Sequence, residues 1–298
     1  MLTNLHTHTC FSDGSDEPLK YIQTAICKGM SSIGFSDHSP LPFENSFALR
    51  EDQVSNYCNT ILSLKNQSYE SGMADSGLSS FQLPSTAINI FLGLEVDFIP
   101  GASPPFSHLT ETYPMDFLLG SVHLVRNGAL SDLWFIDGPD PATYDDGLNK
   151  LFGGDIRKGV TAYYRQINEM VTTNKMDIVG HLDKIKMHNR NRLFSEEESW
   201  YLSLVDETLD IIKQNGVIVE VNTRGIYKRR CTSTFPGPSV LEKILRMKIP
   251  VTISSDAHSP HEITMLFPEI KKMLWGIGFR EIMDLSSNGW TVVPLSVE

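Results

Sequence analysis

The chain has 298 residues, of which 41% are hydrophobic and 20% are charged, a composition that excludes a fibrous repeat or wholesale disorder. Acidic residues outnumber Lys and Arg by 36 to 25, for a formal net charge of -11, which disfavours nucleic acid as a partner and favours a small substrate. No signal-peptide pattern and no apolar run of ~18 residues is present, so we expect a soluble, cytoplasmic protein without a membrane partner.

Short apolar segments alternate with amphipathic stretches along the chain, and this alternation predicts parallel β/α units. The seven candidate strands are residues 2–6, 32–37, 88–95, 116–123, 176–181, 217–222 and 251–256. The predicted helices are residues 18–30, 160–171, 195–216, 240–247 and 266–274. The expected fold class is therefore α/β, with a parallel sheet.

Two stretches interrupt this rhythm. Residues 66–85 are rich in Ser and Gly and lack apolar periodicity, which predicts a surface-loop insertion before the third strand. Residues 137–154, with their Gly, Pro and Asp content, predict a second long loop on the active-site side. Neither reads as a domain boundary, so we expect residues 1–298 to form a single domain.

Potential metal ligands follow almost every predicted strand. Along the chain they are His6, His8, Asp37, His38, Glu95, His123, His181, Asp256 and His258. In a parallel barrel, the carboxyl ends of all the strands lie on one face, where active sites are assembled. Six of the nine histidines would therefore converge on one mouth.

Any one of these motifs alone is weak evidence, because a His-X-His pair such as His6 and His8 is more often an ordinary surface feature. Their recurrence at corresponding places in successive units is what favours a metal site. Zn²⁺, Mn²⁺ or Fe²⁺ held by imidazole and carboxylate lowers the pKa of a bound water, which suits hydrolysis. Glu95, the acid at the end of an otherwise apolar strand, is the best candidate to bridge two ions.

These motifs, taken in order, resemble those of the PHP (polymerase and histidinol phosphatase) superfamily. The matching segments are His6-Thr7-His8 with Asp13, Ser36-Asp37-His38, Gly93-Leu94-Glu95, Ser121-Val122-His123, Gly180-His181-Leu182-Asp183 and Ser255-Asp256-Ala257-His258. The resemblance spans nearly the whole chain. It implies a distorted, TIM-like (β/α)7 barrel with a trinuclear centre of divalent transition metals, Zn, Fe or Mn.

The resemblance also implies a distribution of ligands. One ion would be held by His6, His8, Glu95 and Asp256, a second by Glu95, His123 and His181, and a third by Asp13, His38 and His258. The ligands of this third ion are also the residues expected to be catalytic.

Within the superfamily the chain is most similar to the histidinol-phosphatases, as judged by Ser36 to Pro42, Trp134 to Asp137 and Glu220 to Gly225. This similarity implies hydrolysis of L-histidinol phosphate to L-histidinol and phosphate, a step of histidine biosynthesis. The alternative within the family is a phosphoesterase acting on nucleotides or other small phosphomonoesters. Alternatives of other classes are a metal-storage or metal-sensing protein and an amidohydrolase-like barrel.

Basic residues after the fifth and sixth strands could meet a phosphate at the mouth. They are Lys184, Lys186, Arg224, Lys228, Arg229 and Arg230. We expect Arg224 and Lys228 to bind substrate, because the sixth strand ends in no expected metal ligand and leaves its loop free, and Lys186 after the fifth strand is a further candidate. The remaining histidines are His108, His188 and His261, and a solvent or capping role is expected for them.

Overall fold

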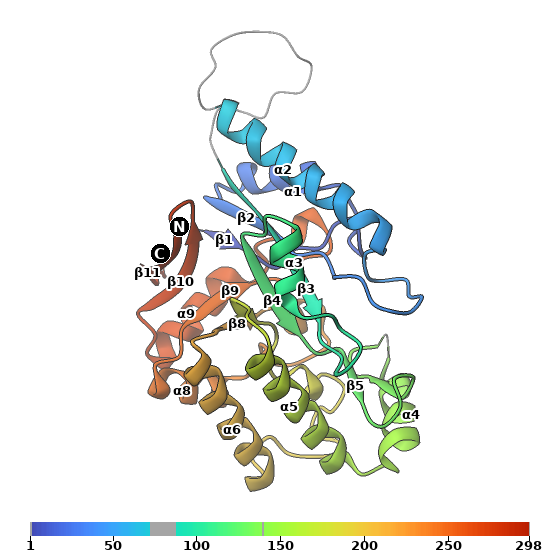
Figure 1. The fold of residues 1–298 in the computed structure, drawn as a ribbon. Coiled ribbons are helices and arrows are strands. Elements are labelled where there is room, and N and C mark those ends of the chain that lie inside the picture. The colour runs from blue at the N-terminus through green and yellow to red at the C-terminus, as the bar shows by residue number, and fades with distance from the viewer. Residues whose placement is uncertain (1, 72–87, 139, 298) are drawn as a thin grey trace.

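A computed structural model describes residues 2–71, 88–138 and 140–297 of the chain. Its centre is a seven-stranded sheet in the order β1-β2-β3-β4-β7-β8-β9, and every neighbouring pair is parallel (Figure 1). The strands are β1 (Thr3–Asn4), β2 (Ser32–Phe35), β3 (Asn89–Asp97), β4 (Phe117–Ser121), β7 (Ile178–Val179), β8 (Ile218–Asn222) and β9 (Val251–Ser254). Each lies within or overlaps one of the seven predicted strands, so the predicted parallel α/β barrel is confirmed.

The sheet closes between its first and last strands. Thr7 and Ala257 form a parallel bridge just beyond β1 and β9. The His8 amide donates to the Ala257 carbonyl at 2.8 Å, and the Ala257 amide donates to the His6 carbonyl at 3.0 Å. These bonds place the segments that follow β1 and β9 side by side.

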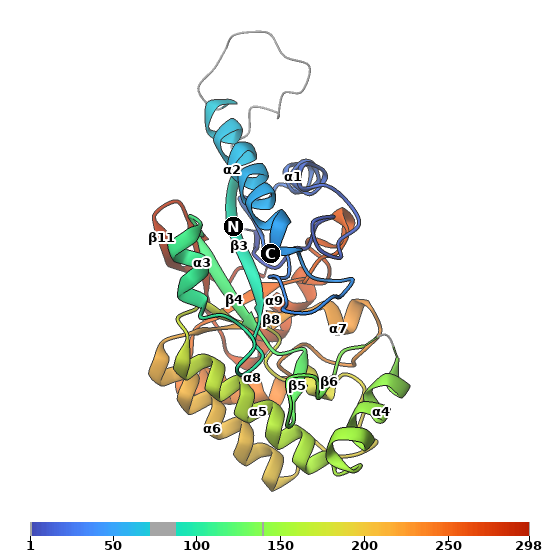
Figure 2. The same cartoon turned by 45° about the vertical axis from the view of Figure 1, so that its right-hand side comes forward.

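Helices lie outside the strands, as Figures 1 and 2 show from two directions. The longer ones are α1 (Pro18–Cys27), α2 (Val54–Ser71), α4 (Pro141–Phe152), α5 (Ile156–Thr173), α6 (Ser199–Asn215), α8 (Pro238–Met247) and α9 (Phe267–Ile277). The short ones are α3 (Phe106–Thr112), α7 (Arg224–Tyr227) and the 3₁₀ turns η1 (Glu51–Gln53), η2 (Lys184–Lys186) and η3 (Pro260–Glu262). Within the described residues, no helix is long and apolar enough to cross a bilayer.

The barrel interior is apolar at one end and polar at the other. A small hydrophobic cluster that includes Leu5, Phe91 and Phe117 fills the amino-terminal end. An antiparallel hairpin of β10 (Glu281–Ser286) and β11 (Gly289–Pro294) packs against this cluster through Leu285 and Trp290. The polar side chains therefore gather at the carboxyl-terminal end, which leaves that mouth for chemistry.

The structure corrects the predictions for the two long loops. Residues 66–71 belong to helix α2, and residues 72–85 of the predicted insertion lie outside the described part of the chain. Within 137–154, helix α4 replaces the expected loop. Asp140 caps its start by accepting a hydrogen bond from the Thr143 amide, and Gly153 ends it in the left-handed conformation at φ 62°. The Pro, Asp and Gly content thus marks helix ends.

A hairpin of β5 (Leu124–Arg126) and β6 (Leu133–Phe135) follows β4 directly and was not predicted. It carries the chain from His123 to Asp137 along the rim of the polar mouth. The Ile136 amide donates to the His123 carbonyl at 3.0 Å, so the hairpin is tied back to the end of the fourth barrel strand.

Candidate metal centre

The structure brings together the nine side chains that were predicted as metal ligands. They are His6, His8, Asp13, His38, Glu95, His123, His181, Asp256 and His258. These residues, with Asp97, form five overlapping groups in which the ligand atoms lie within 4.8 Å of one another. We call the nine residues the metal cluster.

Glu95 lies at the centre of the metal cluster, near the end of β3. Its Oε1 atom is 2.9 Å from His181 Nε2 and 3.6 Å from His123 Nε2. Its Oε2 atom faces the other way, 3.1 Å from His6 Nε2 and 3.3 Å from His8 Nε2. The two oxygens of one carboxylate thus address two groups of imidazoles, which is the geometry that a bridging ligand needs.

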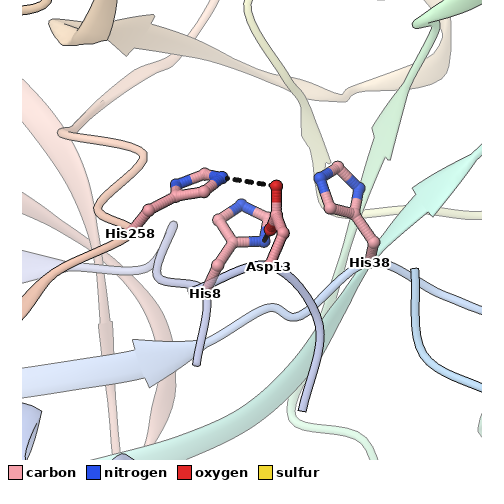
Figure 3. A group of neighbouring side chains, drawn as sticks. All are labelled: His8, Asp13, His38 and His258. Carbon is pink, nitrogen blue, oxygen red and sulfur yellow. Dashed lines mark ion pairs between the residues drawn. The ribbon is translucent and has the colours of Figure 1, made fainter. Parts of the chain in front are cut away.

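A second part of the metal cluster surrounds Asp13, which lies on the loop after His8 (Figure 3). Asp13 Oδ2 is 3.2 Å from His258 Nε2, and Asp13 Oδ1 is 3.7 Å from His8 Nδ1. In Figure 3, His38 and His258 approach Asp13 from opposite sides. The Asp13 side chain keeps 31% of its surface exposed, so this group is the one that opens to solvent.

Two members of the metal cluster have backbones in the left-handed region. His181 has a φ of 23° and Asp256 a φ of 52°, which is unfavourable for residues other than glycine. The Glu220 carboxylate holds the His181 amide at 2.7 Å. Both residues follow barrel strands and face the other ligands, with Asp256 Oδ1 3.8 Å from His6 Nε2.

Two buried carboxylates, Asp97 and Glu220, orient the imidazoles from behind. Asp97 Oδ2 accepts from His38 Nδ1 at 2.9 Å, and Asp97 Oδ1 contacts His123 Nδ1. Glu220 Oε1 accepts from His6 Nδ1 at 2.6 Å. An imidazole that donates a hydrogen bond from Nδ1–H to a carboxylate keeps the lone pair on Nε2 for a metal ion.

Sequence reasoning did not assign Asp97 or Glu220 a place in the site. A signal for Glu220 exists, because it is flanked by Val219 and Val221 in a strand that is buried throughout, and buried strands seldom carry an unpaired acid. Asp37 was also a candidate ligand at a strand end, but it belongs to none of the five metal-ligating groups among the described residues and instead supports the loop that carries Asp13. It accepts from the Thr9 amide at 2.8 Å and from the Ser12 hydroxyl at 2.6 Å.

The electrostatics of the metal cluster favour added cations. Burial alone would raise the pKa of Glu95, but His6, His38 and His123 outweigh it and hold that pKa well below its ordinary value. Burial alone would lower the pKa of His38, but Glu95 and Asp97 raise it to about 10. The Glu95 carboxylate is therefore anionic, and the carboxylates around His38 favour a positive charge on its ring, a charge that divalent ions can supply in place of protons.

The donor set fits transition-metal ions on a further observation. Among the residues that the structure describes, His6 Nε2, both ring nitrogens of His8 and His181 Nδ1 are buried without a hydrogen-bond partner. A buried polar atom left unpaired is costly, so such atoms are rare unless they serve another ligand. Imidazole nitrogens mixed with carboxylate oxygens suit Zn²⁺, Fe²⁺ and Mn²⁺.

A cavity of about 220 Å³ opens beside the metal cluster. Six members of the cluster line it, namely Asp13, His38, Glu95, His123, Asp256 and His258. Three cationic side chains, Lys184, Arg224 and Arg230, line it as well. The Lys184 ammonium is 2.8 Å from Asp137 Oδ2, and Arg224 Nη1 donates to the Asp256 carbonyl at 2.6 Å.

Of the three cations predicted to bind substrate, one lines the cavity and two do not. Arg224 lines the cavity, as expected for a substrate contact. The Lys186 ammonium is buried between Asp183, at 2.7 Å, and Glu196, at 3.2 Å. Lys228 contacts Glu262. Neither Lys186 nor Lys228 lines the cavity, so the geometry does not support a substrate contact for them, and Lys184 and Arg230 lie in the cavity wall instead.

The histidines outside the metal cluster divide into two kinds. His261 and His108 are exposed, as predicted. The expected solvent role is wrong for His188, which is 8% exposed and whose Nε2 donates to the Gly138 carbonyl at 2.9 Å. It thereby supports the cavity wall at Gly138.

A larger cavity, of about 980 Å³, lies along α5, and Arg126, Arg157 and Arg165 are among the residues that line it. None of the five groups with metal-ligating geometry includes a residue of its wall, as far as the described residues extend. Convergent ionisable groups identify an active site better than volume does, so the smaller cavity is the candidate.

Comparison with known proteins agrees with this geometry. A "Probable histidinol-phosphatase" of Deinococcus radiodurans is 25% identical to the chain, and the match covers 94% of each protein. The histidinol-phosphatase of Bacillus subtilis is 27% identical over 87% of the chain and 94% of its own length. A crystal structure of histidinol phosphate phosphatase from Lactococcus lactis, complexed with zinc, L-histidinol and phosphate, has a TM-score of 0.66 at 18% identity and covers 97% of the chain and 98% of its own length.

The family model that matches is the PHP domain, over residues 4–224. This range runs from the last residue of β1 through β8 and includes seven of the nine members of the metal cluster, and the other two follow β9 of the same sheet. The resemblance expected from the motifs is confirmed: the chain belongs to the PHP domain family.

Proposed function

We propose that this protein is a metal-dependent phosphomonoesterase that hydrolyses L-histidinol phosphate to L-histidinol and inorganic phosphate. The observation that carries the proposal is the cavity of about 220 Å³ where six members of the metal cluster meet three cationic side chains. Imidazoles and carboxylates there would hold divalent ions, and Lys and Arg side chains would hold the phosphate. The histidinol-phosphatases that match along nearly the whole chain support this choice of substrate.

Divalent ions, when bound, supply Lewis acidity toward water and toward the phosphate oxygens. Glu95 would bridge two ions through its opposed oxygens, with His6, His8 and Asp256 on one side and His123 and His181 on the other. Asp13, His38 and His258 would complete the site at its open end. Zinc in the Lactococcus lactis structure supports this metal class.

The phosphate would be bound by donors already aimed at the cavity. Arg224 is anchored by the Asp256 carbonyl, which fixes its guanidinium beside the metal cluster. Arg230 lines the same wall, and its guanidinium forms no ion pair within the described residues. A fixed guanidinium presents paired N–H donors to phosphate oxygens and orients the phosphoryl group for in-line attack.

Hydrolysis forms a bond between a water oxygen and phosphorus and breaks the ester P–O bond, and the departing alcohol oxygen takes up a proton. Asp13, His38 and His258 are the cluster residues of the open end that line the cavity, so we assign them the contacts with the reacting groups. Lys184, held by Asp137, would neutralise charge that develops on the leaving oxygen.

The cavity volume favours a small phosphomonoester over a nucleotide. About 220 Å³ is below the range of roughly 300–1,000 Å³ typical of drug-sized ligand sites. The net charge of -11 also disfavours approach of a nucleic-acid end. The nucleotide alternative is therefore the weaker one.

Phosphate release from L-histidinol phosphate, AMP and p-nitrophenyl phosphate by the metal-loaded protein tests the proposal. We expect the highest kcat/KM for L-histidinol phosphate. His258→Ala should lose most of kcat, whereas His261→Ala should keep it, because the latter imidazole is 77% exposed and outside the metal cluster. Equal kcat/KM across the three esters would refute this substrate, and unchanged kcat in His258→Ala would refute this site.

A further inference from the structure

Two aromatic side chains, Phe47 and Phe135, form an apolar section of the cavity wall beside the metal cluster. Their rings are stacked, with centroids 5.8 Å apart and planes inclined by 16°. Both rings remain partly exposed. Among the described residues that line this cavity, every other one except Gly138 has an ionisable side chain. The site therefore has one apolar wall among charged groups.

Each ring is held in a fixed position relative to a member of the metal cluster. Phe47 belongs to a loop in which the Asn45 side chain accepts from the Phe47 amide at 3.1 Å. The Leu49 amide donates to the His38 carbonyl at 3.0 Å and so ties this loop to His38. The Phe47 ring also meets the His38 ring edge to face, with centroids 5.6 Å apart.

Phe135 is held from the other side of the cavity. It ends β6, and the residue after it donates its amide to the His123 carbonyl at 3.0 Å. Trp134, its other neighbour, is fully buried and anchors the hairpin through a hydrogen bond to the Tyr144 carbonyl at 2.8 Å. The ring of Phe135 is therefore presented to the cavity by a rigid element.

An acid follows the aromatic wall. Asp137 lines the cavity two residues after Phe135, with its side chain 14% exposed. Phenyl faces attract flat groups through dispersion and ring stacking. The wall is thus matched to a planar group, while the Asp137 carboxylate is already paired with the Lys184 ammonium at 2.8 Å.

We propose that Phe47 and Phe135 select the alcohol part of the substrate by packing against a flat ring. This inference rests on the proposed function, in which the imidazole of histidinol phosphate is that ring. The phosphoryl group reaches the cations and the metal cluster, and the ring of the alcohol contacts the two phenyl groups. Phe47 and Phe135 are specificity-determining residues and take no part in bond breaking.

A matched pair of esters isolates the ring. Phosphoethanolamine contains the aminoethyl phosphate portion of histidinol phosphate and lacks the imidazole. We expect Phe135→Leu and Phe47→Leu each to lower kcat/KM for L-histidinol phosphate about tenfold, the upper scale of one aromatic contact. The kcat/KM for phosphoethanolamine should change less than about twofold. Phe135→Tyr should restore the preference, because it keeps the ring face.

Phe43→Leu is the control, since Phe43 is on the same loop as Phe47 but is 38% exposed and outside the cavity wall. Equal losses on both esters in Phe135→Leu and Phe47→Leu, or unchanged kinetics on both, would overturn the inference and leave the proposed function intact. If the two rings only hold the Phe47 loop against the β5–β6 hairpin, both esters should lose kcat/KM equally and the Tm should be lower.

Failure of the proposed function has a different signature. If the wild-type protein does not cleave L-histidinol phosphate, the same variants are compared on p-nitrophenyl phosphate and phosphoethanolamine. A selective loss on the ring ester upholds the aromatic wall for another flat alcohol, and a loss without selectivity overturns it.

Discussion

Asp97→Asn tests how the metal cluster is organised with a change of a single atom. The carboxylate accepts hydrogen bonds from His38 Nδ1 at 2.9 Å and, through its other oxygen, from His123 Nδ1. Asparagine keeps the shape but offers one acceptor and one donor. One imidazole must then accept at Nδ1, which moves its proton to Nε2 and removes the lone pair that would bind a metal ion.

The expected loss in metal affinity is about 10- to 100-fold, the usual range for a group that orients a ligand, or roughly 1.4–2.8 kcal/mol. Activity measured against added Zn²⁺ or Mn²⁺ reports it as a higher half-saturating metal concentration. Asp206→Asn is the control, since this carboxylate is 55% exposed and pairs only with Lys243 among the described residues. An Asp97→Asn protein with wild-type half-saturation and kcat would refute the reasoning.

Three further outcomes are expected. Arg224→Lys should be nearly as harmful as Arg224→Ala, with a loss of about 2–3 kcal/mol in kcat/KM, because a lysine cannot reproduce paired guanidinium donors. Wild-type kinetics in either variant would contradict the phosphate contact. Lys186→Met should lower the free energy of unfolding by about 3 kcal/mol, since it leaves the buried Asp183 unpaired, while kcat/KM of the folded protein stays unchanged; the reverse pattern would restore Lys186 as a substrate contact. In metal-free protein, protonated His38 should stabilise the fold fully below about pH 6.5, and this stabilisation should be lost as the pH rises toward the folded pKa of about 10. The Tm should therefore fall over this interval and be restored by added Zn²⁺, and a rising Tm would contradict the raised pKa.

The barrel could be predicted from sequence because its strands are short apolar runs of regular spacing. All seven predicted strands are present, and the ligand-bearing residues lie at their carboxyl ends. This succeeded because strand ends in a parallel sheet share one edge, so position in sequence determines position around the mouth.

The loops were harder to predict because turn residues also cap helices. Asp140 and Gly153 mark the two ends of α4, although the segment between them reads as loop by composition. The predicted helix 195–216 starts too early: the Ser195 amide donates to Glu198 Oε1 at 2.8 Å, and α6 begins only at Ser199. Local hydrogen bonds decide these boundaries, and residue type alone does not.

The contacts of charged side chains could not be predicted from chain position. Lys184 and Lys186 are two residues apart in η2, yet one pairs with Asp137 in the cavity wall and the other is buried between Asp183 and Glu196. Arg230 is 44 residues beyond Lys186 and lines the cavity. Partners distant in sequence determine which cation lines the cavity, and only the folded chain brings them together.

Metal content, measured on the purified protein and on Glu95→Gln, tests the central claim most directly. Catalytic sites offer about three protein ligands per ion, so the nine side chains of the metal cluster suit about three divalent ions per chain. We predict close to that stoichiometry in the wild type, with activity lost on chelation. Glu95→Gln should lose more than one ion, because its carboxylate faces two groups of imidazoles. A wild-type protein with less than one ion per chain and full activity in chelator would contradict the account.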